Sequence, residues 1–598
     1  MSEIRIPLRP LSRVLAARAR GENPDNIERA NIRARHDHLR DTLRQRAETR
    51  LLMLAVVFSV LFGTVALRMG ALAASEGIDI AADGPAATSI VAQRSDITDR
   101  QGRLLATNML TKSLYAQTRD LVNPAHAAAQ LARIFPDMDE DTLLRRFTDG
   151  RRFLWLRRTL SPEQQQAVHD IGEPGLLLGR REMRLYPNGP LAAHVLGGVK
   201  FVHEGVQAAE LQGVAGVEAA LDDRLRDPEG DGTPVALALD LVAQTVVEEV
   251  LEGGMRVMGA SGATAVLMKV ATGEILAYAS LPDFDPNDRP EPPRDAAEAA
   301  RDPLFDRAAL GLYEQGSTFK LFTVAQALEE GIARPGTLID TRGPLRISGF
   351  SITDFRSHGP QQTLTDVLVK SSNIGTARLA QAIGPERQRN FLARLGLLEP
   401  PPIELSGVRR AVPLVPQRWG ELSAMTISYG HGVSVSAVQL AAAYASLVNG
   451  GTRVTPTLLL QNAPSPPGER IVSAETSAIL REMLRGVVTH GTASMAEVPG
   501  YAVGGKTGTA DKPKPTGGYY EDRVIATFAG IFPAYAPEYV LVLSLDEPQV
   551  RALGETKRTA GWTAVPVAAE VIRRTAPVLG LRPEIAPDPG IALRLTAR

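Results

Sequence analysis

The feature that most restricts how this chain can fold is an uncharged apolar run, LLMLAVVFSVLFGTVAL, at residues 51–67. Arg50 and Arg68 bracket it, and Arg68 could reach a membrane interface with its long side chain if the helix continues to Ala74. A helix that is apolar on every side is either buried in a large protein or spans a bilayer. The run is long enough to span, so we predict a transmembrane anchor at residues 51–74.

The residues before this run indicate how the anchor is oriented. Residues 1–50 contain 12 Arg and no Lys against 7 Asp and Glu, a net charge of +5. By the positive-inside rule, this Arg-rich tail stays in the cytoplasm and the rest of the chain is exported. A buried core helix and a cleaved signal peptide are the alternatives, since Ala71-Leu72-Ala73 resembles a cleavage site. Fifty residues are too many for an ordinary signal, which favours the uncleaved anchor.

Composition argues against several classes of function. The 598 residues carry a formal net charge of −1, which gives no indication of nucleic-acid binding. The chain has no cysteine, so it can form neither disulfides nor thiolate metal sites. It has nine histidines but no H-E-x-x-H sequence, and we therefore expect neither a metal nor a cofactor.

The pattern of apolar residues divides the exported part into two modules. Residues 87–230 mix short strand-like runs with helical ones at 123–135 and 162–171, and after a linker-like stretch at 71–86 they indicate a separate domain at 75–230. A second domain begins near residue 231, with a strand at 234–239, a helix at 241–251 and a hairpin whose strands, 263–270 and 274–280, flank a glycine turn.

The second domain is also predicted to close with strands. Helical runs dominate residues 317–447. Three further strand-like runs and a helix follow, at 501–510, 524–532, 539–545 and 563–574. Strands at both ends of a segment with helices between them predict one α+β domain at 231–585, with a tail at 586–598.

The first of three short motifs with chemical potential is Ser317-Thr318-Phe319-Lys320. On a helix, positions i and i+3 share a face, so Lys320 could reach the Ser317 hydroxyl. A lysine in a dry, positively biased pocket can act as a base, and backbone N–H groups at a helix start can hold an oxyanion. Taken alone, the motif is more typical of a serine N-cap followed by a surface lysine than of a catalytic pair.

The second motif, Ser371-Ser372-Asn373, follows a helical run and predicts a break between two helices. There Ser371 could relay a proton and Asn373 could hold a substrate amide. The alternative is a loop in which these side chains bond the local backbone.

The third motif is Lys506-Thr507-Gly508-Thr509, on a predicted strand. Lys506 and Thr507 offer a cation and a hydroxyl to a carboxylate, Gly508 leaves room beside the strand, and an edge-strand N–H at Thr509 can complete an oxyanion hole. The motif is not a phosphate-binding loop, because the glycine spacing G-x-x-x-x-G-K is missing.

Together and in this order, the three motifs resemble the S-x-x-K, S-D-N and K-T-G set of penicillin-binding proteins and class A β-lactamases, with S-S-N in the middle. The chain is similar to the class B penicillin-binding proteins over roughly residues 50–585, and within them to the septal peptidoglycan D,D-transpeptidases of cell division, the FtsI type. Residues 94–102 resemble the family's R-G-x-I-x-D-R-x-G motif, with Ser95 in place of Gly, and Gly216-Val217-Glu218 resembles its G-[IV]-E motif. Gln315 stands where proline is frequent and Asp306 where asparagine is frequent.

The resemblance implies a transpeptidase domain with an antiparallel sheet flanked by helices, carried on an N-terminal pedestal domain and a single transmembrane helix. It implies that Ser317 attacks D-Ala-D-Ala, that Lys320 takes its proton, and that Ser371 returns the proton to the leaving amine. It further implies that Asn373 holds the acyl chain and that Lys506 and Thr507 bind the substrate carboxylate. The N–H groups of Ser317 and Thr509 would form the oxyanion hole.

The implied partners are peptidoglycan stem peptides, β-lactam antibiotics, a SEDS-family glycosyltransferase of the FtsW type and other divisome membrane proteins. The implied location is the inner membrane, with a cytoplasmic N-terminus and a periplasmic catalytic domain. The chain shows no E-x-x-L-N segment between Asn373 and Lys506, which argues against a class A β-lactamase. A D,D-carboxypeptidase and a non-catalytic division scaffold remain as alternatives.

Overall fold

The structure is a computed structural model that describes residues 10–23, 25–74, 94–204, 209–227, 232–295, 302–461, 463, 466, 468–514 and 517–584. The chain forms two compact units, Met1–Ser89 and Ile90–Arg598, which are considered separately. The predicted start of the pedestal domain and the predicted tail at 586–598 lie outside the described residues.

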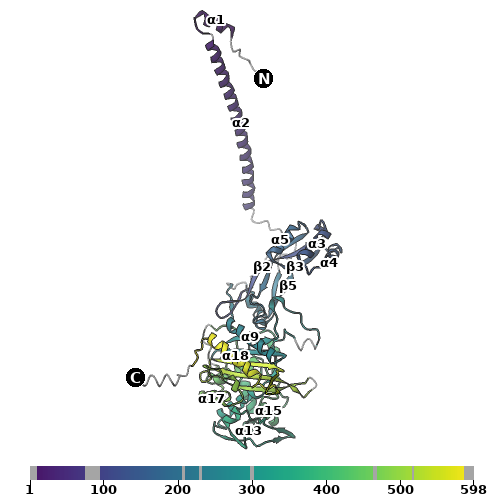
Figure 1. Cartoon of the computed structure of the whole chain (residues 1–598), viewed down its shortest axis with the longest axis vertical. Coiled ribbons are helices and arrows are strands. Elements are labelled where there is room, and N and C mark those ends of the chain that lie inside the picture. Colours follow the sequence, from purple (N-terminus) through teal and green to yellow (C-terminus); the bar gives the residue numbers. More distant parts are fainter. Residues whose placement is uncertain are drawn as a thin grey trace, which may run out of the picture. The chain divides into compact units, whose positions relative to one another are not determined.

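The first unit contains two helices, α1 (Leu11–Ala19) and the long α2 (Asp25–Ala74), drawn in purple in Figure 1. Within α2, the segment Glu48–Arg68 is long and apolar enough to cross a membrane, and none of it is buried in the described structure. At 1.5 Å per residue its 21 residues extend about 31 Å, close to the thickness of a bilayer's hydrocarbon core. The lack of burial contradicts the alternative of a core helix. It does not exclude a signal sequence, which can be equally long, apolar and exposed.

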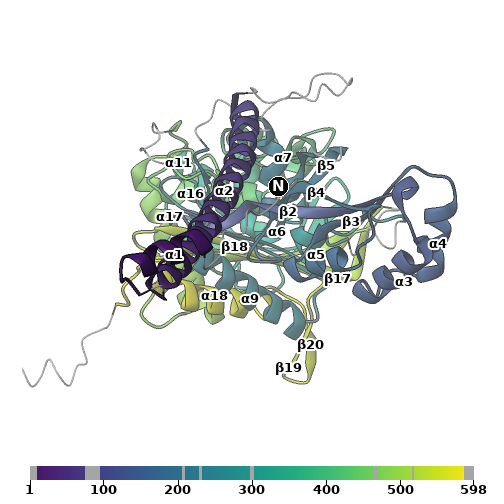
Figure 2. The same ribbon diagram turned by 90° about the horizontal axis from the view of Figure 1, so that it is seen from above.

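The second unit begins with a mixed α/β region around a long central strand, β2. Its sheet has the order β3-β2-β1-β7, and β4 also pairs with β2. The strands are β1 (Ile97–Thr98), β2 (Leu104–Gln117), β3 (Phe153–Leu160), β4 (Leu176–Leu185), β5 (Gly198–Glu204), β6 (Ala209–Ala215) and β7 (Val235–Ala236). The helices are α3 (Pro124–Ile134), α4 (Glu140–Thr148), α5 (Pro162–Asp170), α6 (Ala193–Leu196), α7 (Gly216–Ala220) and α8 (Asp222–Leu225). The predicted helices at 123–135 and 162–171 are confirmed as α3 and α5, and Figure 2 shows α3 and α4 lying against each other.

The two sequence motifs of this region meet in a buried ionic network. Arg94 donates to a Glu218 carboxylate oxygen at 2.6 Å and to Asp222 at 2.7 Å. Arg184 donates to the other Glu218 oxygen at 2.7 Å. Arg94, Arg184 and Glu218 are all nearly inaccessible to solvent. Because a buried carboxylate without partners is costly, the two cations explain why Glu218 is tolerated here.

The remaining part is built on a five-stranded antiparallel sheet of order β16-β17-β18-β8-β9. The predicted hairpin is confirmed as β8 (Gly262–Lys269) and β9 (Ile275–Leu281), and the three later strands as β16 (Gly504–Pro513), β17 (Tyr519–Phe532) and β18 (Tyr539–Asp546). The C-terminal strands therefore complete a sheet that the chain begins more than 200 residues earlier, as the sequence predicts, and β16 lies at its edge.

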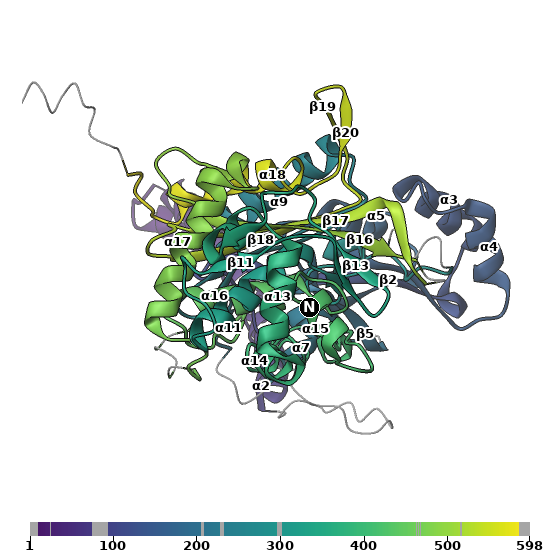
Figure 3. The ribbon, with the colours of Figure 1, turned by 90° about the horizontal axis from the view of Figure 1, so that it is seen from below.

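Helices cover both faces of this sheet, as Figure 3 shows. On one face lie α9 (Leu241–Val257) and α18 (Ala564–Val578), which also pack on each other. On the other face lie α16 (Ala437–Val448) and α17 (Ala474–His490). Every residue of α16 is buried, which accounts for its almost entirely apolar sequence, AVQLAAAYASLV.

The segment predicted to be mainly helical also contains short strands that the sequence did not indicate. These are β11 (Leu338–Asp340), β12 (Leu345–Ile347), β13 (Phe350–Ile352), β14 (Gln361–Thr363) and β15 (Ser434–Val435), and a further short strand, β10 (Tyr313–Glu314), directly precedes the segment. The helices around them are α11 (Lys320–Glu329), α12 (Leu364–Val369), α13 (Asn373–Ile383), α14 (Pro385–Arg394) and α15 (Glu421–Ile427). A last hairpin, β19 (Val550–Ala552) with β20 (Glu555–Lys557), extends away from the main sheet.

Candidate active site

Ser317 lies in the short 3₁₀ helix η3 (Gly316–Phe319), and the α-helix begins only at Lys320. Ser317 thus stands at the start of the helix, as the sequence predicts, although this first turn is 3₁₀ and not α-helical. Gly316 has a φ of 53°, a left-handed conformation that favours glycine, and this turn joins β10 to the helix. The turn leaves the Ser317 side chain half-exposed while Lys320, three residues further along, is fully buried.

Lys320 is directed at the second motif. Its Nζ donates to the Ser371 carbonyl oxygen at 2.6 Å and lies 2.9 Å from the Ser371 Oγ. Among the hydrogen bonds of the described residues, none joins Lys320 to the Ser317 hydroxyl. The structure therefore places Ser371, rather than Ser317, as the immediate partner of the buried lysine.

Ser371 occupies the break between α12 and α13, where the sequence predicts it. Its φ is 63°, an unusual conformation for a residue with a side chain. Strained backbone of this kind persists only where its surroundings fix it, and it is frequent at active sites. The Ser371 hydroxyl lies 2.9 Å from Lys320 Nζ and 3.1 Å from Lys506 Nζ. One hydroxyl thus connects the first and third motifs.

Lys506 projects from the edge strand β16 and is fully buried. Its Nζ also lies 3.2 Å from the Thr507 carbonyl oxygen and 3.4 Å from the Thr507 hydroxyl. That hydroxyl is in turn 2.7 Å from the Thr492 hydroxyl, which the sequence did not indicate as part of the site. The arrangement offers one cation and two hydroxyls beside the Ser371 oxygen.

Burial lowers the pKa of both lysines, and repulsion by the Lys506 cation adds to the effect at Lys320. Burial, and next to it the cation at Lys506, hold the pKa of Lys320 well below its usual value of 10.5, although Asp354 acts in the opposite direction. Burial alone lowers the pKa of Lys506 from 10.5 to about 7. A neutral Lys320 amine can accept a proton near neutral pH, which is what a base beside a serine nucleophile requires.

The edge strand approaches the serine turn closely, and two glycines allow it. A Cβ on Gly508 would lie 2.2 Å from the Gln315 carbonyl oxygen, and a Cβ on Gly316 would lie 2.9 Å from the Thr509 amide nitrogen. Only residues without a side chain fit at this distance. The Thr509 backbone therefore lies beside Ser317, where an oxyanion hole built from their two N–H groups is expected. The Thr509 hydroxyl is turned away and accepts from Ala560 N at 3.1 Å.

Asn373 begins α13, and its side-chain amide donates to the Thr353 carbonyl oxygen at 2.9 Å. This bond fixes the side chain and leaves its own carbonyl oxygen to accept a hydrogen bond from a substrate. The neighbouring Asp354 accepts from the Ser372 hydroxyl at 2.7 Å and from Asn373 N at 2.6 Å. Asp354 was missed by sequence reasoning because nothing in its local sequence connects it to a motif 17 residues away.

Two of the departures from the family pattern, Gln315 and Asp306, have structural partners. The buried Gln315 side chain donates to the Val435 carbonyl oxygen at 2.9 Å and accepts from the Thr527 hydroxyl at 3.3 Å. It thus ties the residue before the serine turn to β15 and β17. Asp306 accepts from the Tyr278 hydroxyl at 2.6 Å and from the backbone N–H of Ala308 at 3.0 Å.

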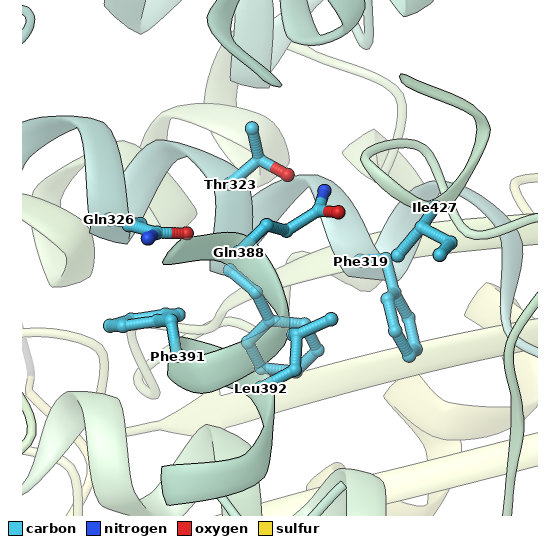
Figure 4. Close-up of a pocket in the computed structure, with 8 residues that line it drawn as sticks. Phe319, Thr323, Gln326, Gln388, Phe391, Leu392 and Ile427 are labelled. Atoms are coloured by element: carbon cyan, nitrogen blue, oxygen red, sulfur yellow. The ribbon is translucent and has the colours of Figure 1, made fainter. Parts of the chain in front are cut away.

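Behind the serine turn, α11 contacts α14, and Figure 4 shows how the side chains of the two helices lie there. A small gap there is lined by Phe319, Phe322, Thr323, Gln326, Gln388, Phe391, Leu392 and Ile427, and it holds no space for a water molecule. Gln388 is fixed within it, since its amide donates to the Ala424 carbonyl oxygen at 2.9 Å. The gap is therefore an imperfection in the packing of α11, the helix that begins at Lys320, and it is not a ligand site.

The sheet with helices on both faces and the serine with two buried lysines define a serine acyl-transfer enzyme of the penicillin-binding type. The profile of the penicillin-binding protein transpeptidase domain matches residues 263–573, and that of the penicillin-binding protein dimerisation domain matches residues 89–238. The chain belongs to the class B penicillin-binding proteins.

Individual relatives agree with this assignment. The chain is 36% identical over 511 residues to a probable peptidoglycan D,D-transpeptidase FtsI of Caulobacter vibrioides, covering 83% of each chain. It is 29% identical over 513 residues to peptidoglycan D,D-transpeptidase FtsI of Escherichia coli, covering 82% of this chain and 84% of the relative. The crystal structure of penicillin-binding protein 3 from Mycobacterium tuberculosis complexed with ampicillin has a TM-score of 0.63 at 27% identity, over 83% of this chain and 97% of that one.

Proposed function

We propose that this protein is a serine D,D-transpeptidase that crosslinks peptidoglycan stem peptides. The observation that carries the proposal is the Ser371 hydroxyl, shared by Lys320 and Lys506 beside the Ser317 turn. In this scheme Ser317 Oγ attacks the carbonyl carbon of the penultimate D-Ala, and neutral Lys320 takes the hydroxyl proton. The N–H groups of Ser317 and Thr509 hold the oxyanion that develops.

Collapse of the oxyanion breaks the peptide bond and releases terminal D-Ala. The departing amine needs a proton, and Ser371 can pass one on from Lys320 because its hydroxyl lies 2.9 Å from that amine. Lys506 and Thr507 would bind the terminal carboxylate before it leaves. An amine of a second stem peptide then attacks the acyl-enzyme, which gives the crosslink and frees Ser317. β-Lactams, which resemble D-Ala-D-Ala, would acylate Ser317 in the same way.

The enzymatic proposal is tested with the full chain in detergent, a donor peptide ending in D-Ala-D-Ala and an amine acceptor. We expect D-Ala release together with a crosslinked product detected by mass spectrometry. D-Ala release with only the shortened donor would identify a D,D-carboxypeptidase instead. If the folded protein releases no D-Ala and takes no penicillin label, the scaffold alternative holds.

The same proposal places the enzyme in the inner membrane at the division septum. Support comes from the apolar segment Glu48–Arg68, the Arg-rich residues before it and the FtsI relatives. In this arrangement residues 1–50 form a cytoplasmic tail, 51–74 the anchor, 75–230 the pedestal and 231–585 the periplasmic transpeptidase domain. Strand synthesis would be supplied by a SEDS-family glycosyltransferase of the FtsW type, with other divisome membrane proteins as further partners.

Orientation and location are tested by fusing a fluorescent protein that matures in the periplasm after Arg598 in dividing cells. We expect fluorescence concentrated at the septum, because the positive-inside rule exports everything after the anchor. A matched fusion to a reporter that is active only in the cytoplasm should be silent. The reverse pattern of the two reporters would overturn the orientation, and signal spread evenly along the envelope would overturn the septal location.

A further inference from the structure

A carboxylate next to the second motif has no role in the scheme above. Asp354 follows β13 by two residues, and its Oδ1 accepts from Asn373 N at 2.6 Å and from Ile374 N at 3.0 Å. Its Oδ2 accepts from the Ser372 hydroxyl at 2.7 Å. Asp354 therefore holds the first backbone N–H groups of α13 from outside the helix, at the turn that presents Ser371.

The charge of Asp354 also bears on the buried amines. Two charged groups act on Lys320 in the described structure, the cation at Lys506 and the carboxylate at Asp354, and they act in opposite directions. During acyl transfer Lys320 takes a proton from Ser317 and becomes a second cation beside Lys506. In a buried site, that repulsion raises the free energy of the protonated state unless a negative charge offsets it.

We propose that Asp354 is a positioning residue of the acyl-transfer site, which fixes the Ser371–Asn373 turn and stabilises the protonated form of Lys320 by its charge. The inference rests on the proposed acyl transfer. It explains how the Lys320 amine can be neutral before Ser317 reacts and can still hold the Ser317 proton afterwards. The proton moves from Ser317 Oγ to Lys320 Nζ and then, through Ser371, to the leaving amine, so none is gained or lost.

The position of Asp354 and its charge can be separated experimentally. The β12–β13 hairpin that carries it is held by a small apolar cluster of its own, in which Ile352 packs with Ile374, Ala377 and Met425. Truncating Ile352 to Ala loosens this attachment, and with it the position of Asp354, but keeps the charge of the carboxylate. Asp354→Asn does the opposite, because an amide oxygen can still accept from the backbone N–H groups while the charge is gone.

The test is the second-order rate of acylation by a fluorescent penicillin, measured from pH 5 to 10 for the wild type and both variants. We expect Asp354→Asn to lower the plateau rate about 10- to 100-fold, because a base without its counter-charge is weaker. We also expect the acidic limb of its profile to move about one unit toward lower pH, because Lys320 then loses its proton more readily. Ile352→Ala should lower the rate at every pH without moving the limb.

An Asp354→Asn profile that keeps the wild-type shape and is only scaled down, as for Ile352→Ala, overturns the inference and leaves the proposed function standing. A wild type that takes no label overturns both. If Asp354→Asn does not fold, Asp354→Glu replaces it, since the retained charge should preserve the wild-type acidic limb. A shifted limb in Asp354→Glu would then count against the role of the charge.

Discussion

Ser317→Ala is expected to abolish acylation by a fluorescent penicillin, with a loss on the order of 10⁶-fold in rate. The reason is that no other hydroxyl can replace the Ser317 Oγ at the turn facing Thr509. The Ser371 hydroxyl is already engaged by the amines of Lys320 and Lys506. The measurement is in-gel fluorescence after labelling of the purified full-length protein, compared with the wild type over the same time course.

The variant should remain as stable as the wild type, because no hydrogen bond of the described structure depends on the Ser317 side chain. Its free energy of unfolding should therefore change by no more than about 0.5 kcal/mol. Ser261→Ala is the matched control, since Ser261 is an exposed serine before β8. It should label like the wild type. Equal labelling of Ser317→Ala and the wild type would show that another residue is the nucleophile.

The sheet was largely predictable from the sequence because its strands are almost wholly buried. The burial of β8, β9 and β18 makes each of them a continuous apolar run, such as ILAYASL in β9. The short strands β11 to β14 could not be found in this way. Each is three residues long and partly exposed, so neither the periodicity of its hydrophobic residues nor its composition distinguishes it from a loop.

The candidate site was predictable as a set of residues but not as a set of contacts. The three motifs named Ser317, Lys320, Ser371 and Lys506, yet spacing along a helix suggested that Lys320 would contact Ser317. The structure pairs it with Ser371, 51 residues away. Long-range pairings of this kind depend on how α11, α13 and β16 pack, which local sequence does not encode. The sequence did not indicate Asp354 and Thr492 as part of the site for the same reason.

Gln315 illustrates how packing explains what a motif leaves open. The sequence alone does not explain why glutamine stands here in place of the usual proline. In the structure its amide nitrogen and oxygen bond Val435 and Thr527, on two strands that flank the serine turn. A buried amide with both partners present is stabilising, whereas proline at this position could make neither bond.

Lys506→Met is expected to lower the rate of penicillin acylation about 100-fold or more while it stabilises the fold. Activity falls because the cation that would receive the substrate carboxylate is lost. Stability rises because Lys506 is fully buried and its pKa falls from 10.5 to about 7 on folding. That difference corresponds to roughly 4 to 5 kcal/mol, and the lost hydrogen bonds offset part of it. We expect a net gain on the order of 3 kcal/mol in the free energy of unfolding at pH 7, measured by urea denaturation.

The sign of the pH dependence distinguishes this explanation from a simple gain in packing. Between pH 7 and 10.5 the unfolded wild type binds a proton at Lys506 that the folded protein does not, so its stability should rise with pH over this range. The advantage of Lys506→Met should therefore be largest at or below pH 7 and shrink toward pH 10.5.

Lys512→Met, on the same strand, is the matched control. Although burial opposes it, the carboxylates of Asp546 and Glu547 raise the Lys512 pKa, so this variant should be less stable than the wild type at pH 7. A gain for Lys506→Met that stays constant with pH would mean that the buried amine is not what limits the stability of this site.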